Sequence, residues 1–209
     1  IDAWRQVMAI DDTELPTLQA LERLYAVRER WQDLINVLVR QTQVIYESTQ
    51  IVENHLRIGE LYEGRLGNPE RAIDAYRQAL SVDDRCTDAM TALEQLYTAQ
   101  DRWRDLLDVY EMMLNVKTEP SQQLVIYGRI ALIQEEELGD RMSTIDTYRK
   151  MLMVDASNAP AVRSLERLYR DGEQWHDLAD VYRQHLEALQ DDRARIQVYT
   201  NLAALYRGP

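Results

Sequence analysis

A repeat with an unbroken period of 72 residues constrains this chain more than any other feature. Three tryptophans mark it, Trp31, Trp103 and Trp175, and the surrounding text recurs in phase as LERLYAVRERWQDL, LEQLYTAQDRWRDL and LERLYRDGEQWHDL. A chain that repeats itself at a fixed period of tens of residues typically stacks one structural unit on the next, so that neighbouring units bury a continuous core. The sequence therefore predicts a solenoid.

Each 72-residue unit contains two related halves. The segment RIGELYEGRLGNPERAIDAYRQAL, which starts at Arg57, aligns with RIALIQEEELGDRMSTIDTYRKML, which starts at Arg129. Tyr25, Tyr62 and Tyr97 occupy equivalent places in successive halves, 37 and 35 residues apart. Each half is long enough for two helices and a turn, so the prediction is a tandem series of helical hairpins.

The residues of one half support this interpretation. An amphipathic stripe with spacing of three or four is formed by Ile51, His55, Ile58 and Tyr62. Gly67 can end this helix in a left-handed conformation, and Asn68 can cap the next helix with Pro69 at its first position. Gly139 and Asp140 recur at the corresponding places, and Pro16 and Pro160 predict helix starts in the other type of half.

At this point the chain resembles the tetratricopeptide repeat (TPR) family. The residues that match its signature are Ile58, Gly59, Tyr62, Gly67, Ala72, Tyr76 and Ala79. The resemblance covers essentially the whole chain, and its long two-type pattern is also similar to large bacterial repeat arrays. It implies an all-α fold, a right-handed superhelical solenoid of antiparallel helix pairs, in which small residues let the two helices of a pair approach.

The chain departs from the family pattern at several places. One extra residue precedes Gly67, and Asp84 stands where a proline is usual. In the halves that contain tryptophan, bulkier residues replace the small ones; these are Glu22, Glu94 and Glu166 in the first helix and Leu34, Leu106 and Leu178 in the second. Because a carboxylate packed at such a place needs a partner, we expect each of these glutamates to pair with a nearby arginine.

The register predicts one continuous array of repeats along the whole chain. Five hairpin repeats are expected at residues 13–48, 49–84, 85–120, 121–156 and 157–192, with the end of a truncated repeat at 1–12 and the start of another at 193–209. Polar capping repeats are not evident at either end. We therefore expect a fragment of a longer array, or alternatively ends that pack on one another in an oligomer.

Composition narrows the classes of function. The net charge is −12, with 24 Lys and Arg against 36 Asp and Glu, which disfavours binding to a polyanion such as DNA or RNA. No apolar run approaches the length of a membrane span, and the first residues do not resemble a signal peptide. The location is left unknown, with the cytoplasm as the default. Cys86 is the single cysteine and excludes an intrachain disulfide.

Motifs that carry catalysis are absent from the sequence. It has no GxxxxGK[ST], HExxH, GxSxG or GxGxxG. His55, His176 and His185 lack metal-ligand spacing, and Cys86 falls in an interhelical turn without a neighbouring base. No enzyme activity, cofactor or metal is therefore expected. The recurring Trp, Tyr and Leu positions, like Met112, Met113, Met151 and Met153, are interpreted as core, although the methionines could also form an adaptable binding surface.

Arginines recur along the first helices of the hairpins. In the family this helix lines the concave face, where extended peptides bind. The candidate peptide-binding residues are Arg23, Arg57, Arg129, Arg163, Arg167 and Arg170. Guanidinium groups bind carboxylates in a bidentate manner, so one hypothesis is a module that binds a protein or peptide segment, with an acidic segment as one candidate. The alternatives are that these arginines balance neighbouring glutamates, and that the array is a structural scaffold or self-assembling spacer.

Overall fold

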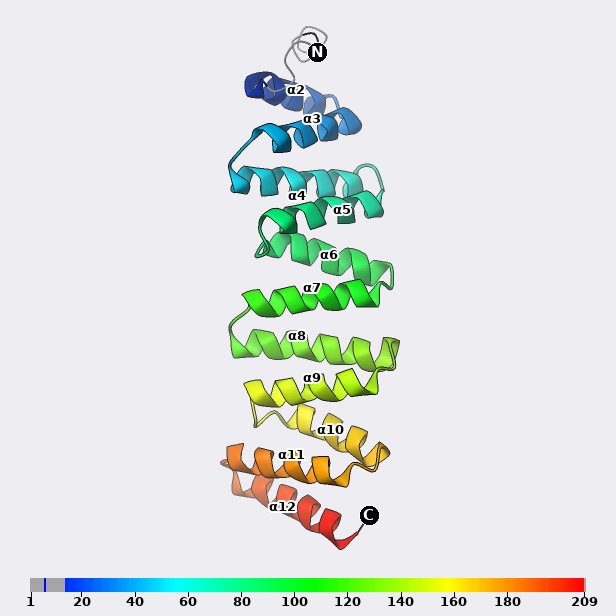
Figure 1. Ribbon diagram of the computed structural model, residues 1–209, viewed down its shortest axis with the longest axis vertical. Helices are drawn as coiled ribbons and strands as arrows, with labels where there is room; N and C mark the ends of the chain where they lie inside the picture. The colour runs from blue at the N-terminus through cyan, green and yellow to red at the C-terminus, as the bar shows by residue number, and fades with distance from the viewer. Residues whose placement is uncertain (1–5, 7–13, 209) are drawn as a thin grey trace. The chain divides into compact units, whose positions relative to one another are not determined.

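The computed structural model describes residue 6 and residues 14–208, and within these residues all regular structure is helical (Figure 1). The α-helices are α2 (Leu15–Val27), α3 (Trp31–Val44), α4 (Ser48–Gly64), α5 (Pro69–Val82), α6 (Thr87–Ala99), α7 (Trp103–Val116), α8 (Pro120–Leu132), α9 (Arg141–Val154), α10 (Ala159–Asp171), α11 (Trp175–Ala188) and α12 (Asp192–Arg207). A π-helical turn, η1 (Ile133–Glu137), extends α8. The predicted all-α class with tandem helix pairs is confirmed. Apart from residue 6, the truncated repeat expected at residues 1–12 lies outside the described residues.

The chain forms two compact units, residues 1–113 and 114–209, and the boundary falls within α7. In unit 1, the pairs α2–α3 and α4–α5 precede α6 and most of α7. In unit 2, the pair α8–α9 precedes α10–α11 and α12. We call the first member of each pair (α2, α4, α6, α8, α10, α12) a first helix and the other (α3, α5, α7, α9, α11) a second helix.

Glycine turns join the helices of the pairs without tryptophan. Gly67 and Gly139 have φ of +59° and +61°, as predicted. Asn68 and Asp140 follow and cap the second helices, because their side chains accept hydrogen bonds from the backbone N–H of Arg71 at 3.2 Å and of Ser143 at 3.1 Å. The extra residue before each glycine is absorbed by a wide turn, since the backbone N–H groups of Leu66 and Leu138 donate to the carbonyls five residues earlier.

In the pairs with tryptophan, the left-handed residue of the turn is not a glycine. Glu29, Asp101 and Glu173, one repeat period apart, have φ of 53°, 54° and 54°. The residue after each donates its N–H to the carbonyl of a tyrosine five residues earlier, as Arg102 does to Tyr97 at 2.9 Å, which closes the helix end as a glycine turn would. A left-handed non-glycine residue is costly, and its recurrence at one register position shows that the turn geometry is dictated by packing.

The core consists of the positions that recur with the repeat. The leucines and tyrosines of the first helices, Leu21, Leu93, Leu165, Tyr25, Tyr97 and Tyr169, are at most 4% exposed. The bulky leucines of the second helices, Leu34, Leu106 and Leu178, are equally buried. The tryptophans are less buried than predicted, because each stands at the first residue of its helix and is half-buried. Arg65 covers the ring of Trp31, with its guanidinium carbon 5.1 Å from the ring centroid.

Gly59 sets the closest approach of two helices in unit 1. A Cβ atom at Gly59 would lie 2.5 Å from Cε1 of Tyr76, so the ring of the second helix α5 rests directly on the backbone of the first helix α4. Ala72 is fully buried in the same pair. The small residues therefore allow the close pairing that the family resemblance implied. No helix among the described residues is both long and apolar enough to cross a bilayer.

Candidate functional site

The candidate arginines all lie on first helices. Arg23 is on α2, Arg57 on α4, Arg129 on α8, and Arg163, Arg167 and Arg170 are on α10. Arg57 is half-buried, whereas the others are exposed. The units separate them into two groups, with Arg23 and Arg57 in unit 1 and the remaining four in unit 2.

In unit 1, Glu22 holds Arg57 in place. Its carboxylate forms an ion pair with the Arg57 guanidinium and accepts a hydrogen bond from the Gln41 side-chain amide at 2.8 Å. Gln41 is only 3% exposed, and its amide oxygen accepts from Asn54 at 3.2 Å. This network joins α2, α3 and α4, so the Arg57 side chain contributes to the packing of these helices.

The other glutamates of this register position have different partners. Glu94 accepts a hydrogen bond from the buried Tyr110 hydroxyl at 2.9 Å. Glu166 forms an ion pair with Arg170 on the same helix at 3.1 Å. The expected pairing with arginine is therefore found for Glu22 and Glu166, and Glu94 contacts a tyrosine hydroxyl.

In unit 2, three arginines form one face of α10. Arg163, Arg167 and Arg170 are separated by four and three residues, which places them on the same side of the helix. Arg167 forms an ion pair with Glu135 of η1, and Arg170 pairs with Glu166. Arg163 is exposed and has no carboxylate within ion-pair distance among the described residues. We call these three residues the α10 arginine face.

This face departs from the repeat. The corresponding residues of α6, one period earlier, are Thr91, Gln95 and Thr98. Because α6 folds as a first helix with neutral side chains at these positions, helix packing does not require the three arginines. The guanidinium groups of Arg163 and Arg167 are therefore available to a ligand without loss of a core contact, whereas Arg170 also contacts the buried Tyr182.

A second cluster, which the sequence interpretation missed, joins the second helices. In unit 1, the guanidinium of Arg77 on α5 lies 5.6 Å from the ring centroid of Tyr97 on α6 and pairs with Asp105 on α7 at 2.8 Å. Arg102 contacts the same ring, at 4.8 Å, and donates to the other oxygen of Asp105 at 2.9 Å. The hydrogen bond from Arg102, reinforced by the charges of both arginines, lowers the pKa of Asp105.

The same arrangement recurs in unit 2. Arg149 on α9 lies 5.8 Å from the ring centroid of Tyr169 and pairs with Asp177 on α11 at 3.3 Å. In both units the tyrosine is 1% exposed and its hydroxyl has no hydrogen-bond partner among the described residues. Burial raises the pKa of both tyrosines. The recurrence of Arg77 as Arg149, one period of 72 residues later, is the sequence signal for this cluster.

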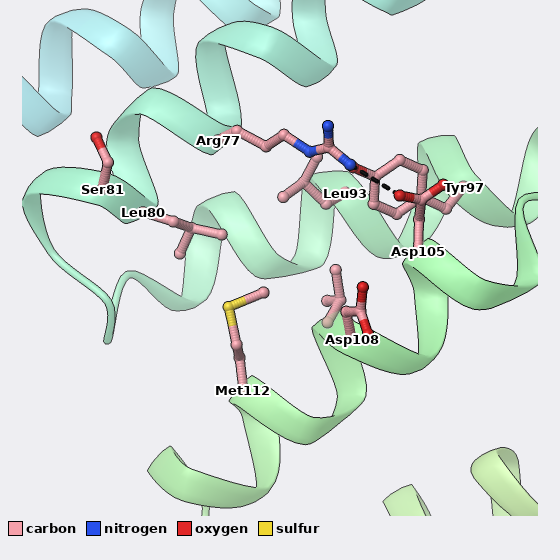
Figure 2. Close-up of a pocket in the computed structure, with 9 residues that line it drawn as sticks. Arg77, Leu80, Ser81, Leu93, Tyr97, Asp105, Asp108 and Met112 are labelled. Atoms are coloured by element: carbon pink, nitrogen blue, oxygen red, sulfur yellow. Dashed lines mark hydrogen bonds and ion pairs between the residues drawn. The ribbon is translucent and has the colours of Figure 1, made fainter.

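A hollow of about 310 Å³ adjoins the cluster in unit 1 (Figure 2). Leu80, Leu93, Val109 and Met112 form its apolar floor, and the Arg77–Asp105 ion pair crosses one end over the Tyr97 ring. Ser81 and Asp108 stand exposed at its edge. The hollow lies between the second helices α5 and α7, with α6 beneath, and so does not involve the candidate arginines. Its size suits one or two side chains of a ligand.

The histidines, the cysteine and the methionines considered for chemistry lie at separate places in the helical packing. Cys86 is buried at the start of α6, and His185 is 5% exposed with its Nδ1 atom 2.8 Å from the Ala156 carbonyl oxygen. Burial lowers the pKa of His55. Across the described part of the chain, no three His, Cys, Asp or Glu side chains gather as metal ligands. Of the methionines, Met113 and Met151 are buried, whereas Met112 lines the hollow and Met153 is 81% exposed.

A family model and several solved structures are similar to this chain. The model of the tetratricopeptide repeat matches residues 55–90, 89–124 and 161–197, which together make up about half of the chain. The crystal structure of MamA is similar at 16% identity over 80% of this chain and 93% of that chain, with a TM-score of 0.42. YrrB, described as a TPR protein with an unusual peptide-binding site, has 13% identity over 77% of this chain and 82% of that chain, with a TM-score of 0.39. PilF of Pseudomonas aeruginosa has 13% identity over 94% of this chain and 86% of that chain, with a TM-score of 0.40.

Proposed function

Because the chain belongs to the tetratricopeptide repeat family, whose members typically act as protein-interaction modules, we propose that it is a non-catalytic module that binds a protein or peptide segment along its first helices. The partner on this surface is an acidic segment. The six candidate arginines supply the recognition, and the ligand changes no covalent bond.

The α10 arginine face is the observation that carries the proposal. Three guanidinium groups line one side of a helix, and packing requires none of them, since α6 has Thr91, Gln95 and Thr98 at the same places. Arg163 has no ion-pair partner in the described part of the chain, and Arg167 and Arg170 are about half exposed in their ion pairs. Because the guanidinium groups of Arg167 and Arg170 remain about half exposed, a carboxylate ligand can approach them from the solvent side, and Arg163 needs no exchange of partner.

The arginines of unit 1 contribute less. Arg57 is bound to Glu22 within a network that reaches the buried Gln41 side chain, so its release would leave a half-buried carboxylate without its partner. Arg23 is exposed and has no ion pair among the described residues. We therefore expect the binding energy to come chiefly from unit 2.

The test exchanges the α10 arginine face for the residues that the chain itself uses in α6. The triple variant Arg163→Thr/Arg167→Gln/Arg170→Thr keeps side chains that a first helix of this protein already accommodates. Binding of a fluorescent glutamate-rich peptide, measured by anisotropy, should weaken at least about tenfold. A control that removes the same charge elsewhere, Arg85→Gln/Arg104→Gln/Arg193→Gln, should bind as the wild type does. Equal weakening in both variants would mean that only net charge matters, and the proposal would fail.

A structural scaffold is the alternative function, and one observation favours it. The helix α12 exposes Ile196, Tyr199 and Tyr206 at 64%, 52% and 63%, and this stripe of one helix face can pack against a second copy. Sedimentation velocity over a range of concentrations separates the two functions. Self-association that Tyr199→Glu abolishes, together with no affinity for acidic peptides, would put the scaffold first.

A further inference from the structure

The hollow between α5 and α7 carries the opposite charge preference from the α10 arginine face. We propose that it binds a segment of a partner protein in which an apolar side chain stands near a lysine or arginine. The apolar side chain rests on the floor of the hollow, and the cationic one pairs with Asp108.

The floor provides the apolar contact. Leu80, Leu93, Val109 and Met112 line it from three helices. A volume of about 310 Å³ lies at the lower end of the range for ligand pockets and suits an aliphatic side chain. Met112 is half-buried at the edge and can change rotamer to fit side chains of different shape.

The charge at the edge selects a cation. Asp105 is already shared by Arg77 and Arg102, whereas Asp108 is exposed and has no ion-pair partner among the described residues. Glu111, one turn further along α7, is exposed as well. The Asp108 carboxylate at the edge of the apolar floor, with Glu111 on the same helix, therefore favours a positively charged side chain and repels an acidic one.

Unit 2 provides an internal comparison. The residue that corresponds to Asp108 is Asp180, and it is neutralised by an ion pair with Arg183, which replaces Glu111 one period later. His176 also lies 3.8 Å from Asp180. The carboxylate is thus free in unit 1 and paired in unit 2, although the two positions are equivalent in the repeat. The free carboxylate is a departure from the period that packing does not explain.

The Tyr97 hydroxyl is a buried polar group beside the hollow. Tyr97 lines the hollow and is over 90% buried, and its hydroxyl has no hydrogen-bond partner among the described residues, as is also the case for Tyr169 in unit 2. A buried polar group without a partner is unfavourable. A polar group of the bound segment can approach it when the exposed Arg77 side chain shifts.

Peptide binding to purified variants tests the proposal. Short fluorescent peptides carry one leucine and one lysine at increasing separations, and matched peptides carry glutamate in place of lysine. We expect the wild type to bind at least one lysine peptide and none of the glutamate peptides. Asp108→Lys should weaken this binding about tenfold, and Ser81→Trp, which fills the hollow without a change of charge, should weaken it as much.

Asp180→Lys is the matched control. It makes the same change of charge at the equivalent position of unit 2, and it should leave the affinity unchanged, with circular dichroism showing that each variant is folded. Equal weakening by Asp108→Lys and Asp180→Lys, or no binding of any lysine peptide, would overturn the proposal. A dimer of the wild type that Ser81→Trp dissociates would also overturn it, since a second copy would then occupy the hollow. The outcome is independent of the α10 arginine face, which none of these variants changes.

Discussion

Substitution of Gly59 by alanine tests how closely α4 and α5 must approach. The new Cβ atom would lie 2.5, 2.6 and 2.8 Å from Cε1, Cζ and Cδ1 of Tyr76, whereas ordinary contact begins at 3.4 Å. The ring would have to retreat by about 1 Å. It is 3% exposed, and its hydroxyl donates to Glu63 at 3.2 Å, so it has little room to move.

Two opposing terms set the size of the effect. Alanine in place of glycine within a helix stabilises by about 1 kcal/mol, and overpacking of a buried site costs about 1–3 kcal/mol. The contact involves three ring atoms rather than the tip of a flexible chain. We therefore expect the cost of overpacking to exceed the gain in helix propensity. Gly59→Ala should lower the free energy of unfolding by about 1–2 kcal/mol.

Gly128 provides the matched control for helix propensity. It lies within α8, and a Cβ atom there would meet nothing within 4 Å. Gly128→Ala should therefore stabilise by about 1 kcal/mol. In a Tyr76→Leu background, which removes the two nearest ring atoms, Gly59→Ala should change sign and stabilise too. The measurement is urea-induced unfolding, monitored by far-ultraviolet circular dichroism. The dependence of the unfolding free energy on urea concentration should be the same for the variants that are compared.

The outcome that refutes the reasoning is simple. If Gly59→Ala stabilises as much as Gly128→Ala does, the ring of Tyr76 yields without cost and the glycine is not required for packing. The second unit already shows one way to accommodate the methyl group. Ala131 replaces Gly59 one period later, and the corresponding Tyr148 is only half-buried, whereas Tyr76 is buried.

Three further predictions concern the repeat positions. Asp101→Gly should raise the free energy of unfolding by about 1 kcal/mol, because φ at Asp101 is 54° and glycine adopts it without strain; an unchanged urea midpoint would contradict this. Glu94→Ala should lower stability by about 1–2 kcal/mol, since the buried Tyr110 hydroxyl loses its acceptor, and the loss should be smaller in a Tyr110→Phe background. The pKa of Asp105 is lowered in the folded chain, chiefly by the hydrogen bond from Arg102, so its contribution is present above the unfolded pKa of about 4 and is lost as pH falls below it. Asp105→Asn should therefore lose less stability than the wild type between pH 7 and pH 3, measured by urea midpoints.

The fold could be predicted because its signals are local and repeated. Gly67, Asn68 and Pro69 specify a helix end, a cap and a helix start within three residues, and the structure confirms each step. The turns before the tryptophans could not be predicted in the same way. Glu29 adopts a left-handed conformation that its side chain does not favour, so the surrounding helices impose it.

The candidate site was predictable only in part. The arginines were visible from their register on the first helices, but the partners of Arg57 and Arg167 depend on side-chain geometry across helices. The expected burial of Trp31 was wrong in degree, because a residue at the start of a helix lies at the rim of the packed layer. The hollow depends on side chains from three helices, and no single stretch of sequence contains that information.

Departures from the period identify the surfaces that we propose for binding. Asp105 and Asp177 recur with the same arginine and tyrosine contacts in both units, so structural demand alone accounts for them. The α10 arginine face has no counterpart in α6, and the free Asp108 differs from the paired Asp180 because Glu111 has become Arg183. Stacking of the repeats does not require these differences, since the helices fold with either set of residues at the equivalent positions. The two surfaces that break the period also have opposite charge, one rich in arginine on the first helix α10 of unit 2 and one acidic between the second helices α5 and α7 of unit 1, so we expect them to favour ligand segments of opposite charge.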